Sequence, residues 1–235
     1  MKKAEILFRN NSYFTREAYK SLRTNISFCG DEIKVICLTS CEANEGKSTI
    51  SLELSKSLAE INKKVLLIDA DLRKSVMLSK YTNESNLDGL SQFLAGHIDT
   101  SEAIFNTQIE NLDVIFAGQY PPNPTELLNS KRFTKLIEYA RQNYDYVIID
   151  TPPLGLVIDA AVVTEKCDGA IIIVSKDFVK FSRAKSVKEQ IEKSGCKIIG
   201  TIMNEVNRKK RSASDTYYKK NKYSRYSKYD KYSHY

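Results

Sequence analysis

The sequence predicts an α/β protein with a doubly wound, mostly parallel sheet flanked by helices, followed by a disordered C-terminal tail. Three observations predict this fold: short runs rich in Val and Ile recur, longer stretches of helical character separate them, and aliphatic residues stop at Asn207. Buried parallel strands are near-continuous apolar runs, and their alternation with helices favours a parallel sheet. In such sheets the ligand lies at the carboxyl ends of the strands.

Six apolar runs are the predicted strands, and four stretches between or before them are the predicted helices. The helix ahead of the first strand is amphipathic, with Thr15 in the position of an N-cap. The predicted strands span residues 35–39, 65–68, 114–116, 147–149, 170–174 and 198–203. The predicted helices span residues 15–28, 47–60, 131–141 and 180–193.

Length and composition indicate one domain with appendages in a reducing compartment. The chain has 235 residues, of which 42% are hydrophobic, enough to build a sizeable core. Its five cysteines are scattered and show neither metal-type spacing nor a disulfide framework, which favours the cytoplasm. No apolar run approaches the ~18 residues of a membrane span, and residues 1–5 lack the apolar stretch of a secretory signal.

The positive charge belongs to the tail. Residues 207–235 hold ten Lys or Arg and two Asp, a charge of +8, whereas the remaining 26 basic and 27 acidic residues give −1. The whole protein is therefore not a polyanion binder by charge, although its tail has the composition of one.

A phosphate-binding loop is predicted at residues 40–49, Ser-Cys-Glu-Ala-Asn-Glu-Gly-Lys-Ser-Thr, between the first strand and a helix. Backbone N–H groups there would cradle phosphates, Lys47 would neutralise their oxygens, and Ser48 would hold Mg²⁺. Cys41 replaces the first Gly of the strict pattern, and Asn44 is one of the few other residues that tolerate a positive φ. The alternative is an ordinary helix start. The predicted nucleotide-binding residues are Glu45, Gly46, Lys47, Ser48 and Thr49.

Three carboxylates strengthen the prediction of a nucleotide site. Asp69 and Asp71 follow the second predicted strand, and Asp150 follows the fourth. A carboxylate at a buried strand end is costly without a partner, and a Mg²⁺ ion opposite Ser48 supplies one. A single Asp in this position is more often a turn residue or a helix cap, but three of them in this order with the loop favour a P-loop NTPase-like domain.

Together these motifs resemble the bacterial tyrosine kinases, most closely the separate cytoplasmic kinase of Gram-positive capsule systems, the CpsD/CapB type. The resemblance covers nearly the whole chain. Its motifs are the relaxed Walker A loop at 40–49, Asp-Ala-Asp-Leu-Arg at 69–73, Walker B at 148–153 and Pro-Pro-Asn-Pro-Thr-Glu-Leu-Leu at 121–128, together with the Tyr-rich end. Ala43 and Asn44 depart from the Pro-Gly often found in that family.

The resemblance implies ATP and Mg²⁺ as cofactors and a role for each site residue. Lys47, Asp69 and Asp71 would be catalytic, with Asp69 as the base that accepts the tyrosine proton. Ser48, Asp71 and Asp150 would lie on the metal side. The implied domains are an N-terminal helical oligomerisation segment at 1–30, a P-loop kinase domain at 31–206 and an autophosphorylated tail at 207–235.

The resemblance also implies partners. These are a homo-oligomer, a membrane adaptor of the polysaccharide co-polymerase type that activates the kinase, and a tyrosine phosphatase that resets it; no nucleic acid is expected. The protein would be cytoplasmic and peripheral at the inner face of the plasma membrane through its adaptor. The implied function is ATP-dependent autophosphorylation that regulates capsular or exopolysaccharide synthesis and export.

Half of the 14 tyrosines lie in the tail, and the last five recur at every third residue. A tail of Lys, Arg, Ser and Tyr cannot form a core. Its alternative functions are solubilisation and nucleic-acid binding, because interleaved Tyr and basic residues stack on bases and contact phosphates. Next to a kinase-like site the tyrosines are the predicted phosphoacceptors, namely Tyr217, Tyr218, Tyr223, Tyr226, Tyr229, Tyr232 and Tyr235.

The N-terminal helix carries Glu17, Lys20 and Arg23 on one face. This resembles the Glu-x-x-Arg-x-x-Arg oligomerisation motif of the same family, with Lys20 in place of the first Arg. Lys lacks the planar fork of Arg, so a bidentate contact there is lost. The alternative is a solvated, salt-bridged helix face.

Two rival functions remain at this level. A positioning ATPase of the MinD or ParA kind shares the fold and the metal site, but has a signature Lys where this chain has Glu42, an acidic group that repels phosphate. The other rival is a nucleotide-regulated module that binds RNA or membranes through the tail.

Overall fold

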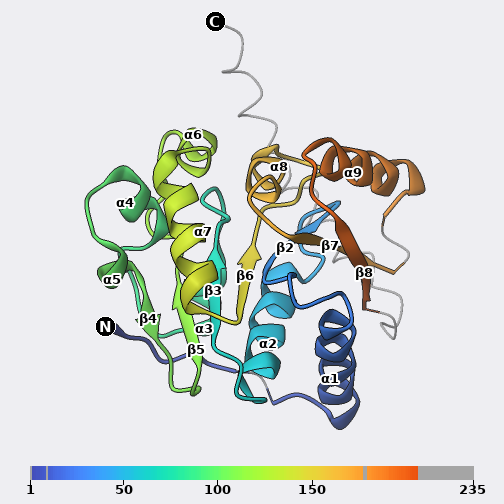
Figure 1. Ribbon diagram of the computed structural model, residues 1–235, viewed down its shortest axis with the longest axis horizontal. Helices are drawn as coiled ribbons and strands as arrows, with labels where there is room; N and C mark the ends of the chain where they lie inside the picture. Colours follow the sequence, from blue (N-terminus) through green and yellow to red (C-terminus); the bar gives the residue numbers. More distant parts are fainter. Residues whose placement is uncertain (1, 9, 177–178, 206–235) are drawn as a thin grey trace, which may run out of the picture. The chain divides into compact units, whose positions relative to one another are not determined.

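One twisted sheet of eight strands forms the centre of the described chain, residues 2–8, 10–176 and 179–205 of a computed structural model (Figure 1). The strand order is β1-β4-β5-β3-β6-β2-β7-β8, and every neighbouring pair is parallel except β4 with β5. The strands are β1 Lys2–Lys3, β2 Val35–Ser40, β3 Val65–Asp69, β4 Phe105–Asn106, β5 Leu112–Ile115, β6 Tyr146–Asp150, β7 Gly169–Ser175 and β8 Ile198–Asn204. The predicted doubly wound, mostly parallel sheet is confirmed.

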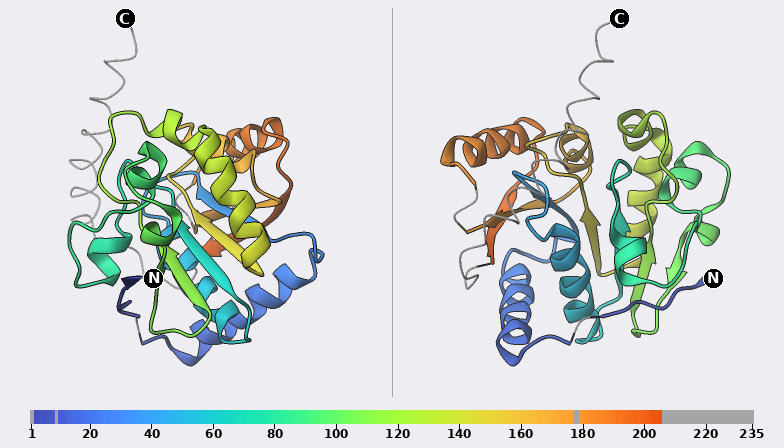
Figure 2. Two further views of the ribbon diagram at one scale, coloured as in Figure 1. Left: turned by 60° about the vertical axis from the view of Figure 1, so that its left-hand side comes forward. Right: turned by 180° about the vertical axis from the view of Figure 1, so that it is seen from behind.

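Helices cover both faces of the sheet (Figure 2). Side chains alternate along a strand, so β2 turns Ile36 and Leu38 toward α1, α2 and α3, and turns Val35 and Cys37 toward the opposite layer with α4 and α7. Fully burying each large aliphatic side chain stabilises the fold by about 1.5–3 kcal/mol. The helices are α1 Tyr13–Ser27, α2 Lys47–Ala59, α3 Met77–Tyr81, α4 Leu90–Ala95, α5 Thr100–Ala103, α6 Pro124–Leu128, α7 Lys131–Asn143, α8 Asp159–Thr164 and α9 Phe181–Lys193.

The six predicted strands and four predicted helices all exist, with ends displaced by a few residues. The predicted cap of the first helix is wrong. Ser12 is the N-cap, because its hydroxyl accepts the backbone N–H of Thr15 at 3.2 Å, and Thr15 lies inside the first turn. Ser130 caps α7 in the same way through the N–H of Phe133.

The described residues up to Asn204 form one compact unit. None of the helices in the described part of the chain is long and apolar enough to cross a membrane. The predicted tail and its seven phosphoacceptor tyrosines lie outside the described residues, so the tail prediction and the three domain boundaries stay predictions.

Candidate active site

The loop between β2 and α2 has the backbone geometry of a phosphate cradle. Gly46 is the N-cap of α2 and adopts φ 90°, and Asn44 adopts φ 62°. The use of Asn at a positive φ was expected from the sequence and is confirmed. The loop places the N-terminus of a 13-residue helix, with its unpaired N–H groups and positive dipole end, at the carboxyl ends of the strands.

Glu45 holds the loop together from inside. Its side chain is fully buried and accepts the N–H of Glu42 at 2.6 Å and the N–H of Ser175, at the end of β7, at 2.7 Å. Burial raises the pKa of this carboxyl, against those two hydrogen bonds. Asn204, at the end of β8, donates its side-chain amide to the carbonyl oxygen of Glu45 at 2.9 Å. Glu45 therefore shapes the loop with its side chain, and only its backbone is left to serve a nucleotide.

Lys47 is buried under the loop. Its Nζ donates to the hydroxyl of Ser40 at 3.0 Å, and that hydroxyl donates to the carbonyl of Glu42 at 2.6 Å. Burial lowers the pKa of Lys47, while the carboxylates of Asp150, Asp71 and Glu45 favour its charged form. The ammonium thus lies in the field of the predicted metal-side carboxylates.

The next two side chains of α2 diverge. The Ser48 hydroxyl hydrogen-bonds to Asp150. Thr49 turns instead toward α3, where its hydroxyl lies 2.6 Å from that of Tyr81 and accepts from Lys80 at 3.1 Å. Of the predicted nucleotide-binding residues, the structure brings Ser48 to the carboxylates and ties the Thr49 side chain to the neighbouring helix.

The sheet topology brings the three predicted carboxylates together. β6 lies between β2 and β3, and Asp69 and Asp150 are direct partners in the parallel register. Both side chains are 1% exposed. The Asp150 carboxylate accepts from Ser51 at 3.1 Å, and its backbone carbonyl accepts the N–H of Ala70 at 2.8 Å. This register places the start of the Asp69–Arg73 segment beside the end of β6.

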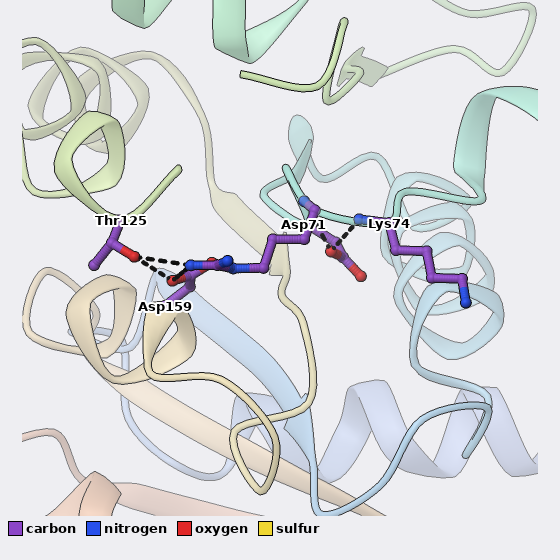
Figure 3. A network of polar contacts seen from close by, with 5 residues as sticks. Asp71, Lys74, Thr125 and Asp159 are labelled. Carbon is purple, nitrogen blue, oxygen red and sulfur yellow. Dashed lines mark hydrogen bonds and ion pairs between the residues drawn. The ribbon is translucent and has the colours of Figure 1, made fainter. Parts of the chain in front are cut away.

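Asp69 and Asp71 are held by short-range contacts. Asp69 accepts the N–H of Asp71 at 3.2 Å on one oxygen and the Ser75 hydroxyl on the other. Asp71 is less buried and accepts the N–H groups of Arg73 and Lys74 at 3.3 and 2.9 Å (Figure 3). Asp71 is thus the most accessible of the three carboxylates.

The three carboxyl groups all favour protonation relative to free Asp. Burial raises the pKa of Asp150 to about 6, with a further contribution from the Asp71 charge. Burial, and next the charge of Asp150, raises the pKa of Asp69 well above its usual range. Burial raises that of Asp71, against hydrogen bonds from Lys74 and Arg73 and the charge of Lys47. Negative charge at this edge of the sheet is therefore undercompensated.

This donor set fits a Mg²⁺–nucleotide complex rather than a bare ion. In the described part of the chain, no cluster of three or more His, Cys, Asp and Glu side chains is arranged to hold a metal alone. Mg²⁺ is commonly bound by one or two protein carboxylates plus substrate phosphates and water. Ser48, Asp71 and Asp150 offer one hydroxyl and two carboxylates, and Lys47 lies in the field of both carboxylates.

The predicted oligomerisation residues lie on α1, but they do not share one environment. Glu17 and Lys20 form an exposed ion pair of 2.7 Å. Arg23 instead donates to the carbonyl and hydroxyl oxygens of Ser57 on α2 at 2.6 and 3.1 Å, and lies 3.9 Å from Glu60. Their role in assembly stays a prediction.

Comparison with known proteins places the chain among proteins with this fold. A family model described as AAA domain matches residues 33–204. MinD of Pyrococcus horikoshii, solved in complex with Mg-ADP, is 26% identical with a TM-score of 0.64 and covers 77% of this chain and 73% of its own. The fold and the site therefore define a P-loop protein of the AAA domain class.

Closer relatives narrow the class to one family. Tyrosine-protein kinase CpsD of Streptococcus agalactiae serotype III is 44% identical over 193 residues, 82% of this chain and 83% of that protein. YwqD of Bacillus subtilis, also a tyrosine-protein kinase, is 36% identical over 88% of both chains. The kinase domain of Escherichia coli tyrosine kinase ETK is 31% identical with a TM-score of 0.79, covering 89% of this chain and 91% of its own. The chain belongs to the bacterial tyrosine kinases and is a protein-tyrosine kinase.

Glu42 occupies the loop position at which the rival ATPases were expected to carry Lys. The Glu42 carboxylate accepts from Arg183 of α9 at 3.1 Å, so the acidic group at this loop position is held by a cation of the same chain. Residues that shape the site but carried no signal in the sequence are Ser51, Ser175, Arg183 and Asn204. Each belongs to another part of the fold or lacks a motif of its own.

Proposed function

We propose that this kinase transfers the γ-phosphoryl group of ATP to the tyrosines of its own C-terminal cluster, in trans within a homo-oligomer. The observation that carries the proposal is the meeting of Lys47 and Ser48 with three carboxylates at the ends of adjacent strands. The tail supplies seven tyrosines in the same chain.

In this proposal the protein positions the reactants and neutralises charge. The loop backbone and the N-terminus of α2 bind the phosphates, and Lys47 leaves the Ser40 hydroxyl to reach the phosphate oxygens. Bound Mg²⁺, held on the side of Ser48, Asp71 and Asp150, supplies further neutralisation of phosphate charge. Asp69 accepts the proton of the tyrosine hydroxyl, and its raised pKa makes it a stronger base than a free Asp.

We infer the cellular setting from the same family. The phosphorylation state of the tail regulates synthesis and export of a capsular or extracellular polysaccharide. A membrane adaptor of the polysaccharide co-polymerase type activates the kinase at the inner face of the plasma membrane, and a tyrosine phosphatase resets it. Nucleic acid is not a partner in this proposal, because the described domain carries no excess of positive charge without the tail.

The decisive experiment is incubation of the purified chain with Mg-ATP, followed by mass spectrometry for phosphotyrosine. The wild type is expected to acquire phosphate, and Asp69→Asn to lose at least about a hundredfold of the rate because its base is gone. The matched control is Asp113→Asn on β5, a buried carboxylate that accepts from Tyr144 and Asn106 and is paired in register with Leu66, three residues before Asp69 on β3. ATP hydrolysis without phosphotyrosine, or an active Asp69→Asn variant, contradicts the proposal.

A further inference from the structure

The segment that carries Asp69 and Asp71 is tied to two helices that the proposed chemistry does not use. Arg73 Nε donates to Asp159 Oδ2 at 2.6 Å, and its Nη2 donates to Asp159 Oδ1 at 3.0 Å. The same Nη2 donates to Thr125 Oγ1 at 3.0 Å, and that hydroxyl donates to Asp159 Oδ1 at 2.7 Å. These three residues, here named the Arg73 tie, join the segment to α6 and α8 (Figure 3).

The Arg73 tie has the geometry of a rigid anchor. The Asp159 side chain is fully buried, while Arg73 is 28% exposed, so the ion pair is shielded from water on its acidic side. A planar guanidinium that binds both oxygens of a carboxylate fixes orientation as well as distance. The Thr125 hydroxyl closes a triangle of hydrogen bonds, which restricts the remaining rotation of the fork.

The anchor acts on Asp71 through one residue. The side chain of Arg73 is held by Asp159, and the backbone N–H of the same Arg73 donates to Asp71 Oδ1. The N–H of the next residue, Lys74, donates to that oxygen as well. A displaced guanidinium would therefore move the two amides that orient the Asp71 carboxylate, the most accessible of the three.

We propose that the Arg73 tie is a positioning unit for the kinase reaction: Arg73, Asp159 and Thr125 fix the Asp71 carboxylate in the orientation that the metal–nucleotide complex requires. The inference rests on the proposed place of Asp71 on the metal side. It also gives a role to Thr125 in the Pro-Pro-Asn-Pro-Thr-Glu-Leu-Leu segment at 121–128. Through its hydrogen bond to Arg73, Thr125 connects α6 to the site, although the two residues are about fifty positions apart in the sequence.

Binding of ADP, measured by calorimetry with saturating Mg²⁺ and with EDTA, separates positioning from simple stabilisation. Thr125→Val keeps the side-chain shape but removes the hydroxyl. It is expected to reduce the affinity gained from Mg²⁺ by roughly tenfold, as loss of a group behind a metal ligand does, while the EDTA affinity stays unchanged. Thr125→Ser keeps the hydroxyl and is expected to behave as the wild type.

The matched control is Thr164→Val on the same helix as Asp159. The Thr164 hydroxyl is buried and bonds to the carbonyl of Ala161 and the hydroxyl of Ser194, away from the Arg73 tie. This variant is expected to lose stability but retain the full gain from Mg²⁺. Hydrogen exchange of the Arg73 and Lys74 amides gives a second readout, expected to quicken in Thr125→Val and to stay unchanged in Thr164→Val.

If Thr125→Val keeps the gain in affinity from Mg²⁺, the variant Asp71→Asn shows whether the proposed site or only the positioning role of the Arg73 tie is wrong. If Asp71→Asn keeps the gain from Mg²⁺, the proposed site is wrong. If Asp71→Asn loses the gain while Thr125→Val keeps it with unchanged exchange, only the positioning role is overturned. Should Thr125→Val not fold, Arg73→Lys replaces it, since Lys retains the charge without the fork; a wild-type Mg²⁺ gain in that variant equally overturns the inference.

Discussion

Lys47 is the residue on which the proposed chemistry depends most directly. Lys47→Met keeps the apolar stem in its buried position but removes the ammonium that meets Ser40 and the carboxylates. We expect phosphotyrosine formation to fall by at least about a hundredfold, because a preorganised charge at the transferred phosphate is lost. Anti-phosphotyrosine detection measures the activity, and circular dichroism reports the fold.

The matched control for this variant is Lys63→Met, the same substitution at an exposed position beyond the end of α2. It is expected to retain activity. Equal activity of Lys47→Met and Lys63→Met would remove Lys47 from the site.

The raised pKa of Asp150 predicts how the stability of the metal-free protein depends on pH. Its folded pKa of about 6 lies above the unfolded value of 3.8, so the folded state binds the proton more tightly. The stability from this group is therefore full below pH 4 and is lost as the pH rises through 6, by about 2–3 kcal/mol. Asp69, also raised, acts in the same direction.

Urea denaturation in EDTA between pH 4 and 8 measures this effect as the difference between wild type and Asp150→Asn. The variant cannot ionise at this position, so its free energy of unfolding is expected to exceed that of the wild type increasingly toward pH 8. Parallel curves for the two proteins would contradict the assignment. In a parallel series with Mg-ADP in place of EDTA, the ligand is expected to stabilise the wild type most at high pH, where the carboxylates are charged.

At the residue scale the sequence predicted which carboxylates lie close together but not every contact that holds them. The carboxylates follow apolar runs, and parallel strand ends meet, so the meeting of Asp69 with Asp150 could be predicted. Cys41 has no such signal: it fills a Gly position, yet its side chain is fully buried beside Leu154, and burial raises its thiol pKa to about 12. Cys41 can occupy this loop position because its side chain is packed in the core, and no local sequence pattern indicates that packing.

At the scale of elements, α1 offers a test of assembly. Arg23 binds the end of α2 in its own chain, so Arg23→Ala is expected to cost about 1–2 kcal/mol of stability by leaving the Ser57 carbonyl without its charged donor. Among the described residues Glu17 forms an ion pair with exposed Lys20, so Glu17→Ala is expected to stay within about 0.5 kcal/mol of the wild type.

The oligomer test therefore uses Glu17→Ala first. If this face of α1 is an interface, sedimentation of Glu17→Ala shifts toward monomer without a loss of stability, and autophosphorylation falls with it. In the double variant with Arg23→Ala, sedimentation is expected to shift further toward monomer, because loss of the Arg23 contact changes how α1 packs on α2. Unchanged sedimentation of both variants would leave Glu17 and Lys20 as a solvated helix face.

Long elements could be predicted, whereas short ones could not. Apolar runs such as residues 65–68 predict buried strands, and α7 has enough turns to show an apolar stripe. The two-residue strand β1 consists of Lys2–Lys3 and pairs with β4 at the sheet edge, where no hydrophobic pattern is required. Helices of four to six residues, α3 to α6 and α8, are too short to display a period.

At the scale of the whole molecule, the position of a residue relative to the strands determines whether its contacts can be predicted from the sequence. Motifs that follow strands fall at one sheet edge, so the core of the site was predictable. Contacts between segments far apart in the sequence were not: Arg73 meets Asp159 across 86 residues, and Asn204 meets Glu45 across 159 residues. The first contact joins the end of the Asp69–Arg73 segment to α8, and the second joins the end of β8 to the loop; no sequence pattern indicates either pairing.

The division of charge along the chain leads to the last prediction. The tail is expected to accept the phosphate on its tyrosines, and the resulting loss of its positive charge is expected to loosen the oligomer. The tail carries +8 and the rest of the chain −1, with undercompensated carboxylates at the site. The contour length of 29 residues is at most about 95 Å, which is enough to reach a neighbouring subunit. Each phosphate adds about −1.5 to −2, so full modification takes the tail to roughly −2 to −6.

Two variants separate the acceptor from the switch. Truncation after Val206 is expected to preserve ATP binding and the fold but to eliminate most autophosphorylation. Replacing Tyr223, Tyr226, Tyr229, Tyr232 and Tyr235 with Phe keeps the rings and the basic charge but removes the hydroxyls, so it is expected to lock the associated state. Mass spectrometry after Mg-ATP treatment tests the first half, and phosphate mainly outside residues 217–235 would refute it. Light scattering tests the second: phosphorylated wild type should be smaller than the Phe variant, and equal masses would mean that phosphorylation does not control assembly even if the tail is the substrate.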